Sequence, residues 1–555
     1  MGPIRRLATL AVLALTFAGW SAGSPPAPAT LRALGDLIQA EPQLDLGGFG
    51  AVLFTAQGPV WNGTRSAAGM VPMDLRTPVL VGELSGRLVI LAAARLAERR
   101  RLDFRRPLGA YLPELRTAPA GPGHLKQLAQ VDLGLLAAEA TGRVDTIPRL
   151  VPHYQLERNL LPALAARSDL FPPGFRQTRS AGATDLLALL LERTQKRPWR
   201  QVLAAEALKP LGMRGSAFLT PAQAEAVPCF FRDGARCDPR ILESLVPPLS
   251  PALSLRSSLA DLAAAGTSLL AACAGQPGPL SPRVARTVLA PAIPGQLDRQ
   301  GYASGLGWNL TDYRLGYLGR VAWTYGTSVT HQTLIILLPD LGLGVVLAEI
   351  RSDPTGLFQF KHIARDLLQT YAELELGRPR PAFHVPSVLR TIPEGQRPLP
   401  GLYAAPAGVA EVGFQGDLLT VSARGGYSEF TWAGAGRFQP VADNEFAALE
   451  WSGDRLSVIW RSGARVSLAK AEPAALPLAL EETALPVEAR GSIQRRGTGL
   501  IRQREGAWVI TADDGQSYLL LPAAADVRIL CDEGSALFGC RITADPAGAL
   551  HLLGP

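Results

Sequence analysis

The stretch from Leu80 to Leu115 constrains the fold of this chain more than any other part of the sequence. It reads LVGELSGRLVILAAARLAERRRLDFRRPLGAYLPEL, which is a strand end, a turn, an apolar segment, a run of arginines and a loop with proline. From Leu88 to Leu96 the residues are apolar on nearly every side, as is typical of a helix buried in the centre of a domain. The stretch therefore predicts a central helix that is entered through a turn and left through a charged segment.

Three groups of motifs in the chain resemble those of one known family. The exit of the predicted helix ends in YLPEL at Tyr111 to Leu115, and later segments read LKPLGM at Leu208 to Met213 and SGLGW at Ser304 to Trp308. Together they resemble the penicillin-binding proteins, class C β-lactamases and related serine esterases. The resemblance implies an α/β (α+β) fold, a β-lactamase/transpeptidase-like domain with an antiparallel sheet. An all-helical insertion is expected between residues 115 and 260.

The same resemblance implies a catalytic site whose chemistry the residues of this chain do not supply. In the family, a nucleophilic serine starts the helix, and a lysine three residues later lies on the same face. These positions hold Glu83 and Gly86, and the positions of the family's tyrosine and asparagine hold Arg179 and Ala181. The H-x-G or K-T-G motif falls on Thr324 to Gly326, with Thr324 in place of the cation and Gly326 kept. A hydroxyl nucleophile needs an adjacent base, and neither glycine nor a permanently protonated arginine is one.

The sequence therefore favours a non-catalytic protein with a binding or scaffolding role at the cell envelope, a pseudo-hydrolase with a cell-wall or peptide ligand. The alternative is a serine hydrolase of the esterase, peptidase or β-lactamase type with a rearranged site, in which Ser85 is the nucleophile. The simpler role for Ser85 is a helix N-cap, for which serine is among the preferred residues. A third alternative is that the C-terminal β regions carry the function.

Glu83 and Arg179 suggest a more specific hypothesis about the altered site. Their family counterparts face each other across the cleft, so we expect the two side chains to form a charge-assisted pair that fills it. The alternatives for Glu83 are a pair with Arg87 or simple solvation. His331 is expected in an apolar strand. The only S-x-x-K sequence in the chain, Ser467 to Lys470, is expected in a strand, where the serine and lysine cannot align on one helix face.

The pattern changes after the predicted catalytic-type domain, which we place at residues 30–377. Residues 378–400 carry six prolines and predict a linker. Short alternating segments over residues 401–470 predict a β-meander that resembles the lipocalin-like domain often appended to this family. Residues 471–486 predict a second linker, and residues 487–555 predict a second β region. The sequence leaves open whether the two β regions form one barrel or two.

The N-terminus indicates export. Arg5 and Arg6 precede an apolar run from Leu7 to Trp20, followed by small residues and proline, so residues 1–23 predict a signal peptide. No later segment has the apolar length of a membrane span, and we expect a periplasmic or extracellular protein. Oxidising compartments permit disulfides, and two local ones are predicted, Cys229 with Cys237 and Cys531 with Cys540.

Composition and charge argue against other classes of protein. The net charge of +7 is small for 555 residues, and basic residues are not interleaved with aromatic ones, so nucleic-acid binding is not expected. The six histidines are scattered and no cysteine pair has zinc spacing. The sequence predicts no metal site and no cofactor, and it does not indicate the oligomeric state.

Overall fold

The structure is a computed structural model. It describes residues 26–40, 48–66, 73–117, 128–139, 160–161, 164, 180–220, 250–292, 304–312, 314–328, 331–350, 357–381, 390–405, 408–423, 426–442, 446–453, 455–460, 465–471, 483–488, 498–504, 507–511, 517–523, 526–530, 541–544 and 550–553. The predicted signal peptide, Arg179 and the four cysteines of the predicted disulfides lie outside these residues. Cys273 lies inside them as a free thiol, and burial raises its pKa.

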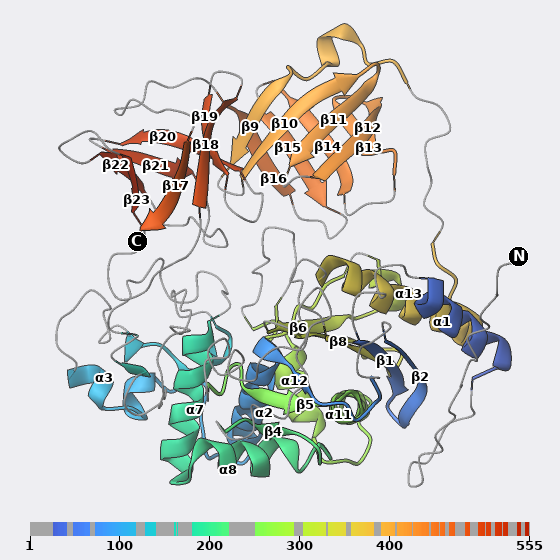
Figure 1. Ribbon diagram of the computed structural model, residues 1–555, viewed down its shortest axis with the longest axis vertical. Coiled ribbons are helices and arrows are strands. Elements are labelled where there is room, and N and C mark those ends of the chain that lie inside the picture. The colour runs from blue at the N-terminus through green and yellow to red at the C-terminus, as the bar shows by residue number, and fades with distance from the viewer. Residues whose placement is uncertain are drawn as a thin grey trace, which may run out of the picture.

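The N-terminal domain is built on an antiparallel sheet, as predicted, and the sheet has five strands. In the order β2-β1-β8-β7-β6, its strands are β2 (Gly58–Ser66), β1 (Gly48–Thr55), β8 (Leu343–Ile350), β7 (His331–Leu338) and β6 (Ala322–Thr327). The whole of β7 and β8 is buried, because helices cover both faces of the sheet (Figure 1). Helices α1 (Pro28–Ala40) and α13 (Leu357–Leu376) pack on one face. Helices α2 (Ser85–Glu98) and α11 (Leu259–Cys273) pack on the other.

Helix α2 is the buried central helix that the sequence predicts. Every residue from Ser85 to Leu96 is buried, including Arg87 and Arg95. The helical subdomain beside it contains α3 (Glu114–Thr117), α5 (Leu133–Ala137), α7 (Ala181–Gln195), α8 (Trp199–Leu203), the π-helical turn η5 (Ala204–Leu208) and α12 (Pro282–Leu289). Helix α7 of the subdomain lies directly against α2, so the subdomain and the central helix share one core.

The predicted all-helical insertion is wrong in one respect. The strands β4 (Ala217–Phe218) and β5 (Leu255–Ser257) pair with β3 (Val79–Leu80) in a three-stranded sheet of order β3-β5-β4. Strands of two or three residues are too short to show the alternation by which a strand is recognised. The small sheet has a structural consequence, because it holds the turn before α2 against the strand that leads into α11.

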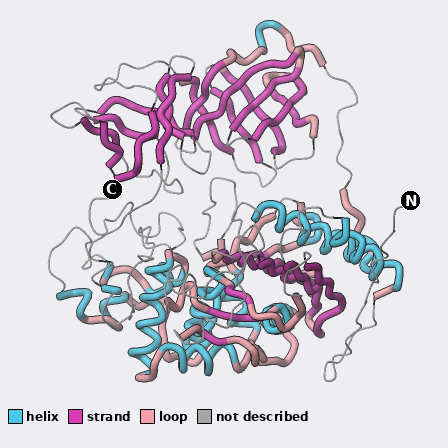
Figure 2. The backbone as a smooth tube through the Cα atoms, in the orientation of Figure 1, coloured by secondary structure: helices cyan, strands magenta, loops and turns pink. Residues whose placement is uncertain are grey.

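The C-terminal part forms two closed barrels, which answers the question that the sequence left open (Figures 1 and 2). The first contains β9 (Gly401–Ala405), β10 (Gly408–Gln415), β11 (Leu418–Ala423), β12 (Gly426–Gly434), β13 (Arg437–Pro440), β14 (Phe446–Ser452), β15 (Arg455–Trp460) and β16 (Arg465–Lys470). The second contains β17 (Thr483–Glu488), β18 (Thr498–Arg504), β19 (Ala507–Thr511), β20 (Ser517–Ala523), β21 (Asp526–Leu530), β22 (Arg541–Ala544) and β23 (Leu550–Leu553).

Both segments predicted as linkers differ in part from that description. Strand β17 begins at Thr483, inside residues 471–486. The sequence did not predict this strand, because a proline within it obscures the strand pattern. Of residues 378–400, the part from Arg390 onward lies against the first barrel, and Ile392 is buried in that barrel's core. None of the helices within the described ranges has the length and apolar character to cross a membrane.

Candidate functional site

The turn that precedes α2 is fixed by two glycines. The 3-10 turn η2 (Gly82–Leu84) lies under the end of β6. Gly82 has a left-handed φ of 52°, and a Cβ there would collide with the backbone carbonyl of Thr327. A Cβ on Gly326 would collide with the carbonyl oxygen of Val81. Only glycine permits this approach, and it places the side chain at position 83 beside the last residue of β6.

Glu83, which the resemblance places at the position of the family's nucleophile, is already hydrogen-bonded. Its Oε2 accepts from the backbone N–H of Thr327 at 2.7 Å and lies 3.4 Å from the Thr327 hydroxyl. A carboxylate bonded to a backbone amide is a strong, charge-assisted acceptor. Backbone amides at such a place are the donors that stabilise an oxyanion in acyl transfer. Here the protein's own carboxylate uses that donor.

Neither arginine that was predicted to pair with Glu83 is seen to do so in the described residues. Arg179 lies outside the described residues, so its pair with Glu83 stays a prediction. The alternative partner, Arg87, instead forms an ion pair with Glu139, with 3.4 Å between Nη1 and Oε1. Glu83 is half-buried rather than simply solvated, since Thr327 binds it.

Gly86, which the resemblance places at the position of the family's lysine, lies at the contact between α2 and α7. A Cβ at this position would be 3.1 Å from Cγ2 and 3.2 Å from Oγ1 of Thr184. Thr184 is itself buried. The helices therefore approach closely where a lysine side chain would have to start, and the position offers no base.

Ser85 is fully buried. Its Oγ donates to the carbonyl of Gly82 at 2.6 Å and accepts from the N–H of Leu255 at 3.0 Å. The predicted N-cap role is wrong, because the cap residue is Leu84 and the Ser85 hydroxyl ties the turn to β5 instead. A hydroxyl held by two backbone groups inside the protein is not placed to contact a substrate.

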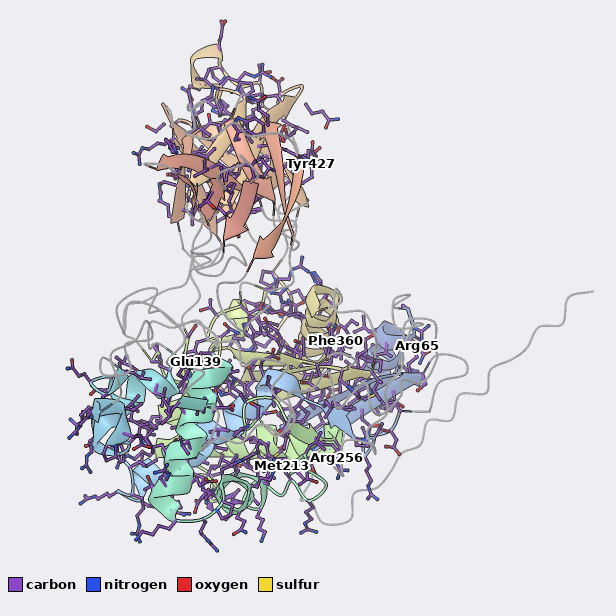
Figure 3. All side chains as sticks on the ribbon, turned by 60° about the vertical axis from the view of Figure 1, so that its left-hand side comes forward. Arg65, Glu139, Met213, Arg256, Phe360 and Tyr427 are labelled. Atoms are coloured by element: carbon purple, nitrogen blue, oxygen red, sulfur yellow. The ribbon has the colours of Figure 1, made fainter. Side chains whose placement is uncertain are left out.

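A buried charged cluster beside α2 is the part of the site that sequence reasoning missed. Arg87 and Glu139 are 6% and 8% exposed, and the Thr184 hydroxyl lies 3.4 Å from Glu139 Oε1. The Arg87 guanidinium packs on Gly307, where a Cβ would collide with it. Glu139 lies beside α7 (Figure 3). The available signal was Arg87 itself, a charge within an apolar helix, since arginine is rarely buried without a partner.

Thr324, which the resemblance places at the position of the family's cation, points into the interior. It is fully buried, and its Oγ1 has no hydrogen-bond partner in the part of the chain that the structure describes. It lines a cavity of about 30 Å³ together with Arg87 and Trp308, and the other lining residues are apolar. The side of β6 that carries the Thr324 side chain therefore faces a small, mostly apolar space.

The remaining candidates have no reactive setting. Ala181 is the first residue of α7, after Ser180, whose hydroxyl accepts from Ala183 N–H at 2.9 Å. His331 lies fully buried in β7, as expected. Ser467 lies in β16, also as expected. Among the described residues, no group of three histidine, cysteine or acidic side chains is arranged to hold a metal ion.

Comparisons with known proteins agree with this architecture. The Beta-lactamase family matches residues 36–369, which is more than half of the chain. Among solved structures, "EstCE1, a hydrolase with promiscuous acyltransferase activity" has a TM-score of 0.51 and 16% identity, covering 61% of this chain and 97% of that one. A class C beta-lactamase has a TM-score of 0.50 and 16% identity, covering 61% of this chain and 96% of that one. At this identity the likeness concerns the fold alone.

The search of curated proteins finds no significant match. The match to the family over residues 36–369 is therefore the finding that classifies the protein. The chain belongs to the beta-lactamase family.

Proposed function

We propose that this protein is an exported, non-catalytic member of the beta-lactamase family that binds a cell-wall or peptide ligand at the cell envelope. The observation that carries the proposal is the hydrogen bond of 2.7 Å between the Glu83 carboxylate and the Thr327 amide. An acylation mechanism needs a hydroxyl at the first of these positions and an unoccupied donor at the second.

Two further observations support the proposal. The contact of Gly86 with Thr184 leaves no place for a base one helical turn from position 83. Thr324 gives no cation on β6, and its hydroxyl faces the interior cavity. Residues of such a site act as a unit, so the loss of even one of them is expected to cost orders of magnitude in rate.

The alternative, a hydrolase with a rearranged site, depends on Ser85. Its hydroxyl donates to Gly82 and accepts from Leu255, and the side chain has no exposed surface. To act as a nucleophile, Ser85 would have to break both bonds and move out of the core. The buried position of Ser85 therefore favours the non-catalytic proposal.

Covalent labelling separates the two proposals. The full chain is incubated with a fluorescent penicillin and, separately, with a fluorescent fluorophosphonate, and labelling is read on a denaturing gel. We expect no labelled band with either reagent. A labelled band that disappears in Ser85→Ala would overturn the non-catalytic proposal and establish the alternative.

The binding part of the proposal has its own test. The full chain is mixed with insoluble peptidoglycan and sedimented, and the bound fraction is compared with that of Glu83→Lys. Because Glu83 is half-exposed at the former cleft, reversing its charge should change binding there if the cleft holds the ligand. Equal sedimentation with and without peptidoglycan would exclude a cell-wall ligand.

A further inference from the structure

Helix α2 ends in a motif whose left-handed position holds an arginine. Arg100 has a φ of 58°, and its N–H donates to the carbonyl of Ala97 at 3.0 Å. The N–H of Arg101 donates to the carbonyl of Leu96 at 2.8 Å. This is the Schellman pattern, in which glycine is the usual left-handed residue because a Cβ is penalised there. The backbone bonds satisfy the helix end, so the arginine side chains are not needed as caps.

Helix α7 ends in the same way. Lys196 has a φ of 51°, and its N–H lies 3.4 Å from the carbonyl oxygen of Arg193. The N–H of Arg197 lies 3.3 Å from the carbonyl oxygen of Glu192. A basic residue in the left-handed position followed by arginine therefore occurs at the ends of two different helices.

The two helix ends lie on the same side of the domain. Near their first turns the helices touch, where Gly86 faces Thr184, and from there both run away from β6 (Figure 1). At 1.5 Å per residue, the end of α2 lies roughly 20 Å from its start beside the former cleft. The barrels lie beyond the opposite side of the domain (Figure 1). We call the four residues at the two helix ends the basic edge: Arg100, Arg101, Lys196 and Arg197.

The four side chains of the basic edge are exposed, and none forms an ion pair with another described residue. Their neighbours behave differently, since Arg99 pairs with Glu206 at 2.8 Å and Arg193 with Glu114 at 3.5 Å. A basic residue in the last turn of a helix interacts favourably with the helix dipole. A basic residue inside the last turn would gain the same dipole interaction without a left-handed backbone. The dipole therefore does not account for basic residues in the left-handed position.

We propose that the basic edge binds an anionic phospholipid surface, an inference that rests on the export in the proposed function. The charges lie along two helix ends rather than converging on one small anion. The large apolar side chains that are exposed in the described residues lie elsewhere, at Leu31, Leu374, Leu376, Leu399 and Tyr427. The contact is therefore peripheral and electrostatic, without insertion. In this orientation the turn at Glu83 and the barrels face away from the membrane.

Vesicle sedimentation of the full chain tests the proposal. The protein is mixed with vesicles of equal parts phosphatidylglycerol and phosphatidylcholine, or of phosphatidylcholine alone. We expect binding to the anionic vesicles only, and loss of binding in about 1 M salt, where charges are screened beyond about 3 Å. Each basic residue near such a surface contributes about fivefold in affinity. The variant R100Q/R101Q/K196Q/R197Q should therefore bind at least tenfold more weakly.

A matched control neutralises four basic residues on the first barrel, R437Q/R455Q/R465Q/K470Q, and should bind like the original chain. Equal binding to both kinds of vesicle, or equal weakening in the two quadruple variants, would overturn the proposal. Because lipid binding is read separately from covalent labelling, a chain that is labelled by penicillin and still depends on the basic edge would refute the proposed function alone.

The double variant R100G/K196G excludes a folding artefact. Glycine relieves the left-handed backbone at both positions while removing two charges. The proposal predicts a more stable protein that binds anionic vesicles more weakly. Unchanged vesicle binding in this variant would contradict it.

Discussion

At the residue scale, the turn before α2 depends on a glycine for two separable reasons. Gly82 needs a left-handed φ, and a Cβ there would also collide with Thr327. Gly342 has a similar φ of 59°, but its nearest neighbour would be 3.9 Å away. Gly342→Ala should lower the free energy of unfolding by about 1 kcal/mol, the cost of left-handed backbone alone. Gly82→Ala should cost clearly more in urea denaturation, and equal costs would show that the collision is relieved by a small shift.

The contact between Gly86 and Thr184 gives a second prediction at this scale. Gly86→Lys should lower the free energy of unfolding by about 1–3 kcal/mol, because overpacking forces neighbouring side chains to move. Thr184→Ala removes Cγ2 and Oγ1, the two atoms nearest to position 86. The loss of unfolding free energy in the double variant should therefore be smaller than the sum of the losses in the two single variants. Additive costs in a double-mutant cycle would show that the helices do not touch as described.

The residues at the altered site could be predicted from the sequence only in part. Motif spacing drew attention to Glu83, Gly86 and Thr324 through the family resemblance, and the structure describes the surroundings of all three. The partner of Glu83 did not, since Thr327 lies 244 residues away and offers a backbone amide, which every residue carries. Glu139 could not be found either, because nothing in its sequence neighbourhood ties it to Arg87.

At the scale of elements, the ends of α2 and α7 carry strain that glycine would remove. Arg100→Gly and Lys196→Gly should each raise the free energy of unfolding by about 1 kcal/mol, since a left-handed L-residue costs roughly 1–2 kcal/mol. Arg101→Gly is the control, as Arg101 is not among the residues with a positive φ. Its urea midpoint should not rise. A rise equal to that of Arg100→Gly would assign the effect to lost charge repulsion instead.

Long elements with clear periodicity were predicted well. The central helix, expected around the apolar residues from Leu88 to Leu96, is α2 at Ser85–Glu98. The short strands of the β3-β5-β4 sheet were missed, because two residues carry no pattern. Strand β17 was missed because it contains Pro486, and a proline within a run of residues argues against a strand.

At the scale of the whole molecule, α13 is joined to the rest of the N-terminal domain by a buried charge cluster. Asp312 is 1% exposed and accepts from Arg365 Nη2 at 2.6 Å and from Lys361 Nζ at 2.9 Å. Lys361 also lies over the ring of Trp323 on β6, 3.4 Å from its centroid. The cluster therefore ties the last helix of the domain to the edge strand that carries Thr327.

Burial alone would raise the pKa of Asp312, but the charges and hydrogen bonds of Lys361 and Arg365 outweigh it and the pKa is lowered. A carboxyl with a lowered pKa in the folded state contributes stability above its unfolded pKa and loses it as the pH falls through the folded pKa. Asp312→Asn should cost about 3–5 kcal/mol at neutral pH, because it leaves two cations buried without their partner. The cost should shrink below the ordinary aspartate pKa of 3.8. A cost independent of pH in urea denaturation would contradict this account.

The Glu83 carboxylate, bound to the Thr327 amide, stands where the proposal says that a catalytic serine is missing. The mass of the intact full chain is measured by mass spectrometry after prolonged incubation with a fluorophosphonate, which forms a stable adduct with a nucleophilic serine. A class C beta-lactamase treated in parallel serves as the positive control. The account predicts that the mass of this protein is unchanged while the control gains one adduct. A stoichiometric adduct on a residue of the turn or of α2 would contradict it.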